Sequence, residues 1–269
     1  MSYQILNETH NGIERITYRP DTPKYKTPLL FQHGAWHGAW CWRWWQELFA
    51  EWGWESHAFS LPNHGGSKHT GLIQFKTYGN YVNTVKDQVA LCKQPPVLIG
   101  HSMGGMITQR YLAWVGDLPA AVLVASMPLY DSLLRYLRKD FASMIQVLLR
   151  FSTWYMVNTP TKVKTAFLSD GALMTPEELV SKLDPESVLI ASLSTRLTWH
   201  PRPNPKTPML VLAGELDHLF STTEEKHLAS FYGADYREFA KTAHNMMMEA
   251  TYRESAMSIH EWLIAKGID

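Results

Sequence analysis

One pentapeptide has the composition of a turn that presents a nucleophile. Gly100-His101-Ser102-Met103-Gly104 places a serine between two glycines, after the apolar run Val97–Ile99 and before a segment with helical spacing. A serine on a sharp strand-to-helix turn exposes its hydroxyl, and flanking glycines keep side chains away from the strained backbone. A plain glycine-rich turn would need neither the strand nor the helix. The pattern therefore predicts Ser102 as a nucleophile.

A serine nucleophile needs a general base and a group that orients this base. Asp217 follows an apolar run, and His244 lies between a short strand-like run and the last helical segment, so the chain order is serine, acid, histidine. His218 is a rival base, but adjacent side chains that leave a strand rarely point at the same partner. Glu215 is a rival acid, and we expect it to be an exposed loop charge. We predict Ser102, His244 and Asp217 as the catalytic residues.

The elements that must position these residues alternate along the chain. Apolar runs without polar alternation predict buried strands, and segments with helical spacing lie between them. Asn11-Gly12 predicts a hairpin turn between residues 3–6 and 13–18. This alternation favours an α/β fold. The predicted central strands are 28–32, 97–99, 121–124 and 209–213, and the predicted helices are 42–52, 78–92, 103–115, 224–231 and 246–265.

From residue 128 to residue 200 the strands stop and helical patterns dominate. Thr175-Pro176 and Asp184-Pro185 each offer a helix N-cap followed by proline and an acid. A proline-dense connector, residues 201–208, returns the chain to the sheet. We predict one domain whose core comprises residues 1–127 and 201–269, with a helical cap inserted at 128–200.

Several of these segments resemble the α/β-hydrolase superfamily over nearly the whole chain. Residues 33–42, His-Gly-Ala-Trp-His-Gly-Ala-Trp-Cys-Trp, are similar to the HG loop of plant methylesterases and hydroxynitrile lyases. Gly214-x-x-Asp217 and His244-x-x-x-x-Glu249 resemble the acid and histidine motifs of the superfamily. Residues 61–67 resemble its G-H-G-x-S loop, although Asn63 replaces a glycine. The resemblance implies a mostly parallel central sheet with helices on both faces and an inserted helical cap.

The resemblance also implies where a tetrahedral intermediate would be stabilised. The superfamily uses two backbone N–H groups as an oxyanion hole, and these correspond here to Ala35 and Met103. Trp36 belongs to a cluster of five tryptophans within ten residues, which is typical of a core or a pocket wall. We expect Trp36 and His101 to contact the substrate.

Composition excludes several other classes of function. Lys plus Arg and Asp plus Glu both number 25, so no basic field favours nucleic acid. Two cysteines, no leader-like N-terminus and no long apolar run predict a soluble cytoplasmic protein. His33-x-x-x-His37 could present two imidazoles, but the glycine between them favours a turn over a metal site. No phosphate-binding loop occurs, and we expect no metal and no cofactor.

The predicted reaction is hydrolysis of small to medium, largely apolar carboxylic esters through an acyl-enzyme. A hydroxynitrile lyase-like activity, a cofactor-free haloperoxidase or perhydrolase, and a ligand-binding receptor module with little turnover remain alternatives. His218 stands where the plant lyases carry lysine, which disfavours the lyase. The surplus of apolar cap residues has three interpretations: pocket lining, packing on the sheet, or transient contact with lipid, with Arg135, Arg138 and Lys139 facing the head groups.

Overall fold

A single mixed sheet organises the fold. The computed structural model describes residues 2–130, 141–192 and 198–269, and their strands form one sheet in the order β1-β2-β4-β3-β5-β6-β7-β8. The β1–β2 and β2–β4 pairs are antiparallel, and the remaining pairs are parallel. The strands are β1 Tyr3–His10, β2 Ile13–Pro20, β3 Leu29–Gln32, β4 Ser56–Phe59, β5 Val97–His101, β6 Ala121–Val124, β7 Met209–Gly214 and β8 Asp235–Phe239.

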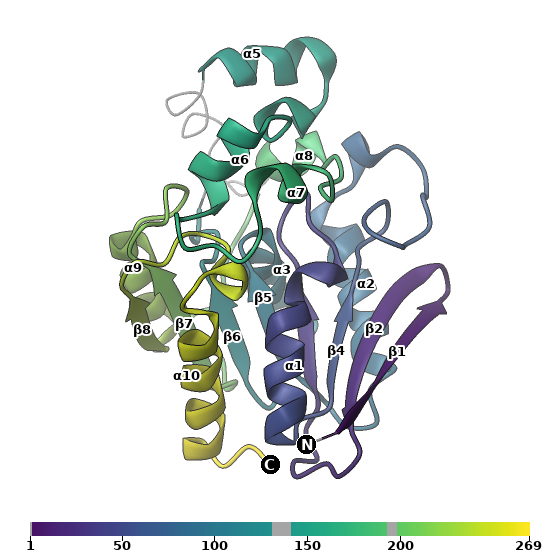
Figure 1. Cartoon of the computed structure of the whole chain (residues 1–269), viewed down its shortest axis with the longest axis vertical. Helices are drawn as coiled ribbons and strands as arrows, with labels where there is room; N and C mark the ends of the chain where they lie inside the picture. The colour runs from purple at the N-terminus through teal and green to yellow at the C-terminus, as the bar shows by residue number, and fades with distance from the viewer. Residues whose placement is uncertain (1, 131–140, 193–197) are drawn as a thin grey trace.

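Helices cover both faces of this sheet (Figure 1). On one face lie α1 (Arg43–Trp52) and α10 (Tyr252–Ala265), and on the other lie α2 (Tyr78–Ala90), α3 (Met103–Trp114) and α9 (Thr222–Tyr232). Alternate residues of each central strand enter opposite cores, since Leu29 and Phe31 pack with α1 and α10 while Leu30 packs with α2 and α3. This period of two explains why the parallel strands are continuously apolar.

The predicted strands and most predicted helices form, with differences at β4 and at residues 246–265. The sequence analysis did not identify β4, whose residues are Ser-His-Ala-Phe, because two of the four are polar. The helix predicted over 246–265 is wrong as a single element. A 3-10 turn, η4 (Met246–Met248), is separated from α10 by Glu249–Thr251, because the buried Glu249 carboxylate accepts hydrogen bonds from Ser169 in another segment.

Short helices occupy the segment between β6 and β7, above the carboxyl ends of the strands (Figure 1). The helix predicted to begin after Thr175 is confirmed, with a capping box between Thr175 and Glu178. The start predicted at Asp184 is wrong, because the Asp184 carboxylate accepts from the amide of Gly65 and the helix begins four residues later. The elements are α5 Phe141–Arg150, η3 Thr153–Met156, α6 Pro160–Phe167, α7 Pro176–Val180 and α8 Val188–Ser192.

Candidate active site

Ser102 sits on a strained turn between β5 and α3. Its backbone has φ 55° and ψ −117°, a conformation that residues other than glycine rarely adopt. Neighbouring segments approach so closely that they require glycine. A Cβ on Gly104 would lie 2.6 Å from the carbonyl oxygen of His33, and a Cβ on Gly34 would lie 2.9 Å from the Cβ of Ser102. The turn therefore brings the end of β3 directly against the candidate nucleophile.

The loops after β7 and β8 bring Asp217 and His244 together. His244 Nδ1 lies 2.7 Å from Asp217 Oδ2, and both side chains are almost fully buried. The other Asp217 oxygen accepts from the amides of Leu219 and Phe220 at 2.7 and 3.0 Å. These contacts fix the carboxylate, and they favour the tautomer in which Nδ1 donates and Nε2 can accept a proton.

The second ring nitrogen of His244, Nε2, is the atom that could accept a proton from Ser102. Within the ranges that the structure describes, Nε2 has no hydrogen-bond partner, and the residue Ser102 is 8 % exposed. Catalytic hydrogen bonds are often long until substrate binds. The structure therefore joins the predicted acid and base, and no hydrogen bond links Ser102 to His244 within the described residues.

Two backbone amides near Ser102 are available as donors. Met103 is the first residue of α3, where the helix leaves N–H groups without an intrahelical acceptor. Ala35 follows Gly34 on the loop after β3. In the described part of the chain, neither amide donates to a protein acceptor. Both belong to the two segments that meet at the Gly34–Ser102 contact, and both residues line the same cavity.

Of the two residues expected to contact substrate, Trp36 lines two cavities formed by described residues, and His101 lines neither of them. His101 is fully buried, and its Nε2 donates to the carbonyl oxygen of His244 at 3.0 Å. Burial, followed by the nearby His244 and His37, lowers the pKa of His101 well below its usual value, so the ring is neutral. His101 therefore lies behind the His244 loop, where it supports that loop.

Two cavities adjoin these residues, and Trp36 lines both. The larger has a volume of about 300 Å³ and lies beside the Asp217 loop. The smaller, about 40 Å³, lies beside Ala35 and Met103. The larger is lined by Trp36, Met156, Val157, Thr161, Lys162, Thr165, Ala166, Phe167, His218 and Leu219. The smaller is lined by Ala35, Trp36, Met103, Met127, Thr153, Met156, Glu186, Ser187 and Ile190.

Comparison with known families identifies the scaffold. The sequence matches the alpha/beta hydrolase family over residues 29–256. The chain belongs to this family. No curated protein sequence matches it. Among solved structures it is similar to a malate-bound thermophilic esterase from Thermogutta terrifontis, with a TM-score of 0.72, 17 % identity, and coverage of 98 % of this chain and 99 % of that one.

Two further structures have the same fold as this alpha/beta hydrolase family member. An esterase from Exiguobacterium antarcticum has a TM-score of 0.70 at 14 % identity, covering 97 % of this chain and 98 % of that one. A monoacylglycerol lipase from Paleococcus ferrophilus has a TM-score of 0.67 at 17 % identity, and the match covers 99 % of this chain and 100 % of that one. The predicted family and fold class are therefore confirmed.

The rival residues of this hydrolase-family chain lie elsewhere. Glu215 is exposed and accepts from the amide of Lys241, and His218 lines the larger cavity. Both ring nitrogens of His33 form hydrogen bonds within the protein, with Gly34 and Leu61. Both ring nitrogens of His37 do the same, with Ala35 and Asn245. Among the residues that the structure describes, no group of three or more His, Cys, Asp or Glu side chains is arranged to hold a metal ion.

Sequence analysis missed the contacts that tie the His244 loop to the segment after β6. Asn245 N donates to the carbonyl oxygen of Phe167 at 3.0 Å, and both an amide and a hydroxyl of Ser169 donate to Glu249. Burial raises the pKa of Glu249 despite these bonds. Partners separated by about 80 residues leave no local signal, and the resemblance of His244-x-x-x-x-Glu249 to a superfamily motif did not indicate them.

Proposed function

We propose that this chain is a serine hydrolase that cleaves carboxylic esters through an acyl-enzyme, with Ser102, His244 and Asp217 as its catalytic residues. The observation that carries the proposal is the buried 2.7 Å contact between Asp217 and His244, formed beside a serine on a strained strand-to-helix turn. That contact orients the imidazole as a base, which a serine hydroxyl requires at neutral pH. The similarity to solved esterases and a lipase supports the same reaction.

In the proposed mechanism, the Ser102 oxygen attacks the ester carbonyl carbon while His244 Nε2 takes the hydroxyl proton. The amides of Ala35 and Met103 donate to the resulting oxyanion. Collapse of the intermediate breaks the C–O bond to the alcohol, which receives the proton from His244. A water molecule then attacks the acyl-enzyme with His244 as base, which releases the carboxylic acid and restores Ser102.

The two cavities suggest an uncharged ester with apolar parts. Most side chains that line the larger cavity are apolar or neutral, and Trp36 and Phe167 contribute aromatic walls. We propose that residues 128–200 act as a cap, because the described part of this segment supplies residues to both cavities. A strong preference for phosphorylated or CoA-linked esters over neutral esters of the same acyl length would contradict this assignment.

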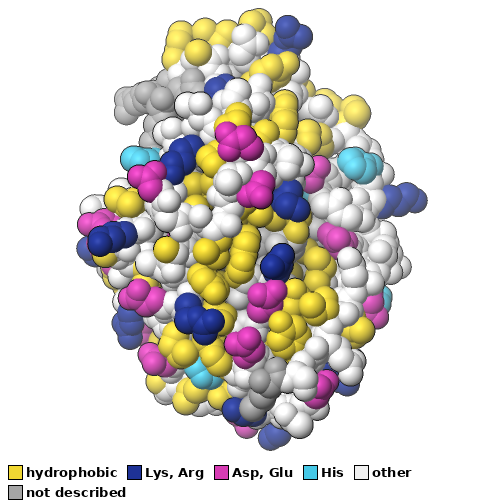
Figure 2. All heavy atoms as spheres, in the orientation of Figure 1, with side chains coloured by type: hydrophobic (Ala, Val, Ile, Leu, Met, Phe, Trp, Pro, Cys, Tyr) yellow, Lys and Arg dark blue, Asp and Glu magenta, His cyan; other side chains and the backbone are white. Residues whose placement is uncertain are grey.

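The exposed face of α5 supports a proposed transient contact with lipid. Phe141, Leu148 and Leu149 are 65, 58 and 76 % exposed, and the helix carries no acidic residue. This apolar cluster forms the tip of the molecule (Figure 2). The three basic residues predicted to face head groups, Arg135, Arg138 and Lys139, lie outside the described residues. Flotation with phosphatidylcholine vesicles, compared with a Leu148→Ser, Leu149→Ser variant, tests this contact, and equal flotation would refute it.

No helix within the described ranges is both long and apolar enough to span a bilayer. Both cysteines carry free thiols, and Cys41 is buried. These thiols support the proposed cytoplasmic location, since a reducing compartment preserves them. Fractionation of cells that express the full chain would test the location, and recovery in a secreted fraction would refute it.

Covalent labelling tests the proposed reaction directly. A fluorophosphonate should form one adduct that peptide mapping places on Ser102, and the protein should hydrolyse p-nitrophenyl esters. Ser102→Ala should fold as the parent does and lose both properties. Near-native hydrolysis by this variant would refute the assignment of the nucleophile. Failure of the parent to form an adduct and to turn over esters would instead favour a binding module.

A further inference from the structure

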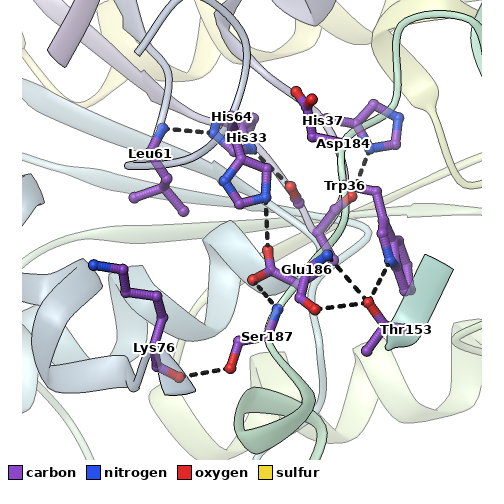
Figure 3. A network of polar contacts seen from close by, with 12 residues as sticks. His33, Trp36, His37, Leu61, His64, Lys76, Thr153, Asp184, Glu186 and Ser187 are labelled. Atoms are coloured by element: carbon purple, nitrogen blue, oxygen red, sulfur yellow. Dashed lines mark hydrogen bonds and ion pairs between the residues drawn. The ribbon is translucent and has the colours of Figure 1, made fainter. Parts of the chain in front are cut away.

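A buried hydroxyl connects Trp36 to the segment between β6 and β7 (Figure 3). Thr153 Oγ1 accepts from Trp36 Nε1 at 3.0 Å and from the amide of Glu186 at 3.1 Å, and it donates to the Glu186 carbonyl oxygen at 2.8 Å. One donated and two accepted bonds use the full capacity of a threonine hydroxyl. Thr153 is 2 % exposed, so water does not readily replace any of these partners.

Trp36 needs such support because its backbone is strained. Its φ is 64°, in the left-handed region that a bulky side chain rarely adopts. Such a conformation persists only where its surroundings enforce it. Here the Trp36 carbonyl oxygen accepts from the amide of Asp184 at 2.8 Å, and the preceding carbonyl, on Ala35, accepts from His37 Nδ1 at 2.7 Å. The peptide groups on both sides of Trp36 are thus held by named contacts.

Glu186 holds the far end of this connection against the core. Its Oε1 accepts from the Tyr81 hydroxyl and from the amide of Ser187, both at 2.6 Å. Its Oε2 lies 3.2 Å from His64 Nε2, and both side chains of this pair are buried. The Ser187 hydroxyl in turn donates to the carbonyl oxygens of Gln74 and Lys76. Thr153 is therefore anchored to the loops and helix that follow β4 (Figure 3).

We propose that Thr153 is a positioning residue for the oxyanion hole, because its hydroxyl fixes Trp36 and thereby the neighbouring amide of Ala35. The inference rests on the proposed function. Ala35, Met103, Trp36 and Thr153 all line the smaller cavity, and Trp36 directly follows Ala35, so the side chain that Thr153 holds adjoins the proposed oxyanion site. An oxyanion donor must be held within about 0.5 Å of its productive position. Thr153 acts through Trp36 and takes no part in bond making.

The test compares Thr153→Val with Thr153→Ser. Valine keeps the shape of threonine but leaves two buried donors, Trp36 Nε1 and Glu186 N, without their acceptor, whereas serine keeps the hydroxyl. Thr153→Val should lower kcat for p-nitrophenyl ester hydrolysis at least about tenfold, towards the 10² to 10³-fold loss of one oxyanion donor, with KM within about threefold. Thr153→Ser should retain kcat within about threefold of the parent protein.

A transition-state analogue separates positioning from general loosening. A trifluoromethyl ketone forms a hemiketal oxyanion on the serine, so its inhibition constant should rise in parallel with the loss of kcat/KM in Thr153→Val. If that variant does not fold, Trp36→Phe removes the same bond from its other end and should give the same loss of kcat and the same rise in the inhibition constant, whereas its KM is not diagnostic because Trp36 also lines both cavities. When both fold, the double variant should lose no more kcat than the single variants, because they interrupt one contact.

The outcomes separate this inference from the proposed function. A folded Thr153→Val protein with kcat within threefold of the parent overturns the inference and leaves the function intact. An equal loss of kcat in Thr153→Val and Thr153→Ser also overturns it, since the hydroxyl would then be irrelevant. If the parent neither hydrolyses esters nor forms an adduct on Ser102, the proposed function and the inference fail together.

Discussion

Gly34→Ala is the most direct perturbation of the contact between the loop after β3 and Ser102. An added Cβ would lie 2.9 Å from both the Cβ of Ser102 and Nδ1 of His101, and 3.2 Å from the His101 carbonyl oxygen. Packed carbon atoms prefer separations of about 3.5–4.0 Å. The loop or the serine must therefore move by about half an ångström or more.

A movement of this size disturbs the proposed oxyanion site more than it disturbs the fold. The amide of Ala35 follows Gly34 directly, and loss of one oxyanion donor costs about 10² to 10³ in kcat, or about 2.7–4 kcal/mol. We expect Gly34→Ala to lower kcat about 10²-fold while KM changes little. Overpacking should lower the free energy of unfolding by about 1–3 kcal/mol.

The assay is p-nitrophenyl ester hydrolysis beside urea unfolding, with Gly79→Ala as the matched control. The same added Cβ at exposed Gly79 in α2 would meet its nearest neighbour, Thr77 Oγ1, at an ordinary 3.6 Å. The control should keep kcat and should be as stable as the parent or up to about 1 kcal/mol more stable. A folded Gly34→Ala protein with kcat within threefold of the parent would refute the reasoning about this contact.

Three further predictions concern buried ionisable groups. Asp217→Asn should lower kcat by about 10⁴-fold with the fold retained, because the amide favours the wrong tautomer of His244; activity within tenfold would contradict this. Burial lowers the pKa of His64, but Glu186, together with the Pro62 carbonyl oxygen and Asp184, more than offsets it, so the net pKa is raised. The His64–Glu186 pair therefore stabilises the fold at low pH, and this stabilisation is lost as pH rises through the folded-state pKa of His64. In urea unfolding, His64→Gln should lower the free energy of unfolding more at about pH 6 than at about pH 9. Burial and then Asp217 raise the pKa of Glu225 well above its usual 4.5. The native state thus keeps a proton that the unfolded chain releases, so stability falls as pH rises above the ordinary glutamate pKa of 4.5. Glu225→Gln should flatten that decline in thermal unfolding measured between about pH 5 and pH 8.

The pH dependence assigned to His64 depends on every charged or titratable neighbour. Besides Glu186 it faces His33 from the end of β3, Tyr81 from α2 and the nearby Asp184. Burial lowers the pKa of His33 well below its usual value, so that ring stays neutral over this range. The carboxylates therefore dominate, and a stability difference that is independent of pH would contradict the assignment.

Local sequence signals were sufficient for most strands of the sheet and for the choice of the candidate catalytic residues. Ser102 lies between an apolar run and a helical pattern, and Asp217 and His244 each follow a strand, so chain order placed all three. The structure then brings two of them into contact at 2.7 Å. The sequence did not indicate β4, because His57 and Ser56 are polar yet buried. Their partners, Thr17 and Gln46, lie 40 and 10 residues away.

The remaining differences have one physical cause, which is the pairing of polar side chains across long stretches of chain. Asp184 is a residue type favoured at helix N-caps, but its carboxylate accepts a hydrogen bond from the amide of Gly65, 119 residues away. Glu249 fits a continuous helix, but it binds Ser169 and the helix breaks. Helix capping is worth about 1 kcal/mol, whereas a hydrogen bond to a charged group is worth about 1.5–3 kcal/mol, so such a bond outweighs a cap.

These long-range pairs give the segment between β6 and β7 a structural role beyond that of the proposed cap. It holds the His244 loop through the Phe167–Asn245 bond and the loop after β3 through the Thr153–Trp36 bond. The two loops are also joined to each other, because Asn245 donates to Nε2 of His37 while Nδ1 of the same ring donates to Ala35. Burial lowers the pKa of His37 to about 4, which keeps the ring neutral and able to accept that bond at physiological pH. The loops that carry the proposed base and the proposed oxyanion donor are thus held by the same set of hydrogen bonds. A substitution in the segment between β6 and β7 should therefore alter kcat even where the residue does not touch the substrate.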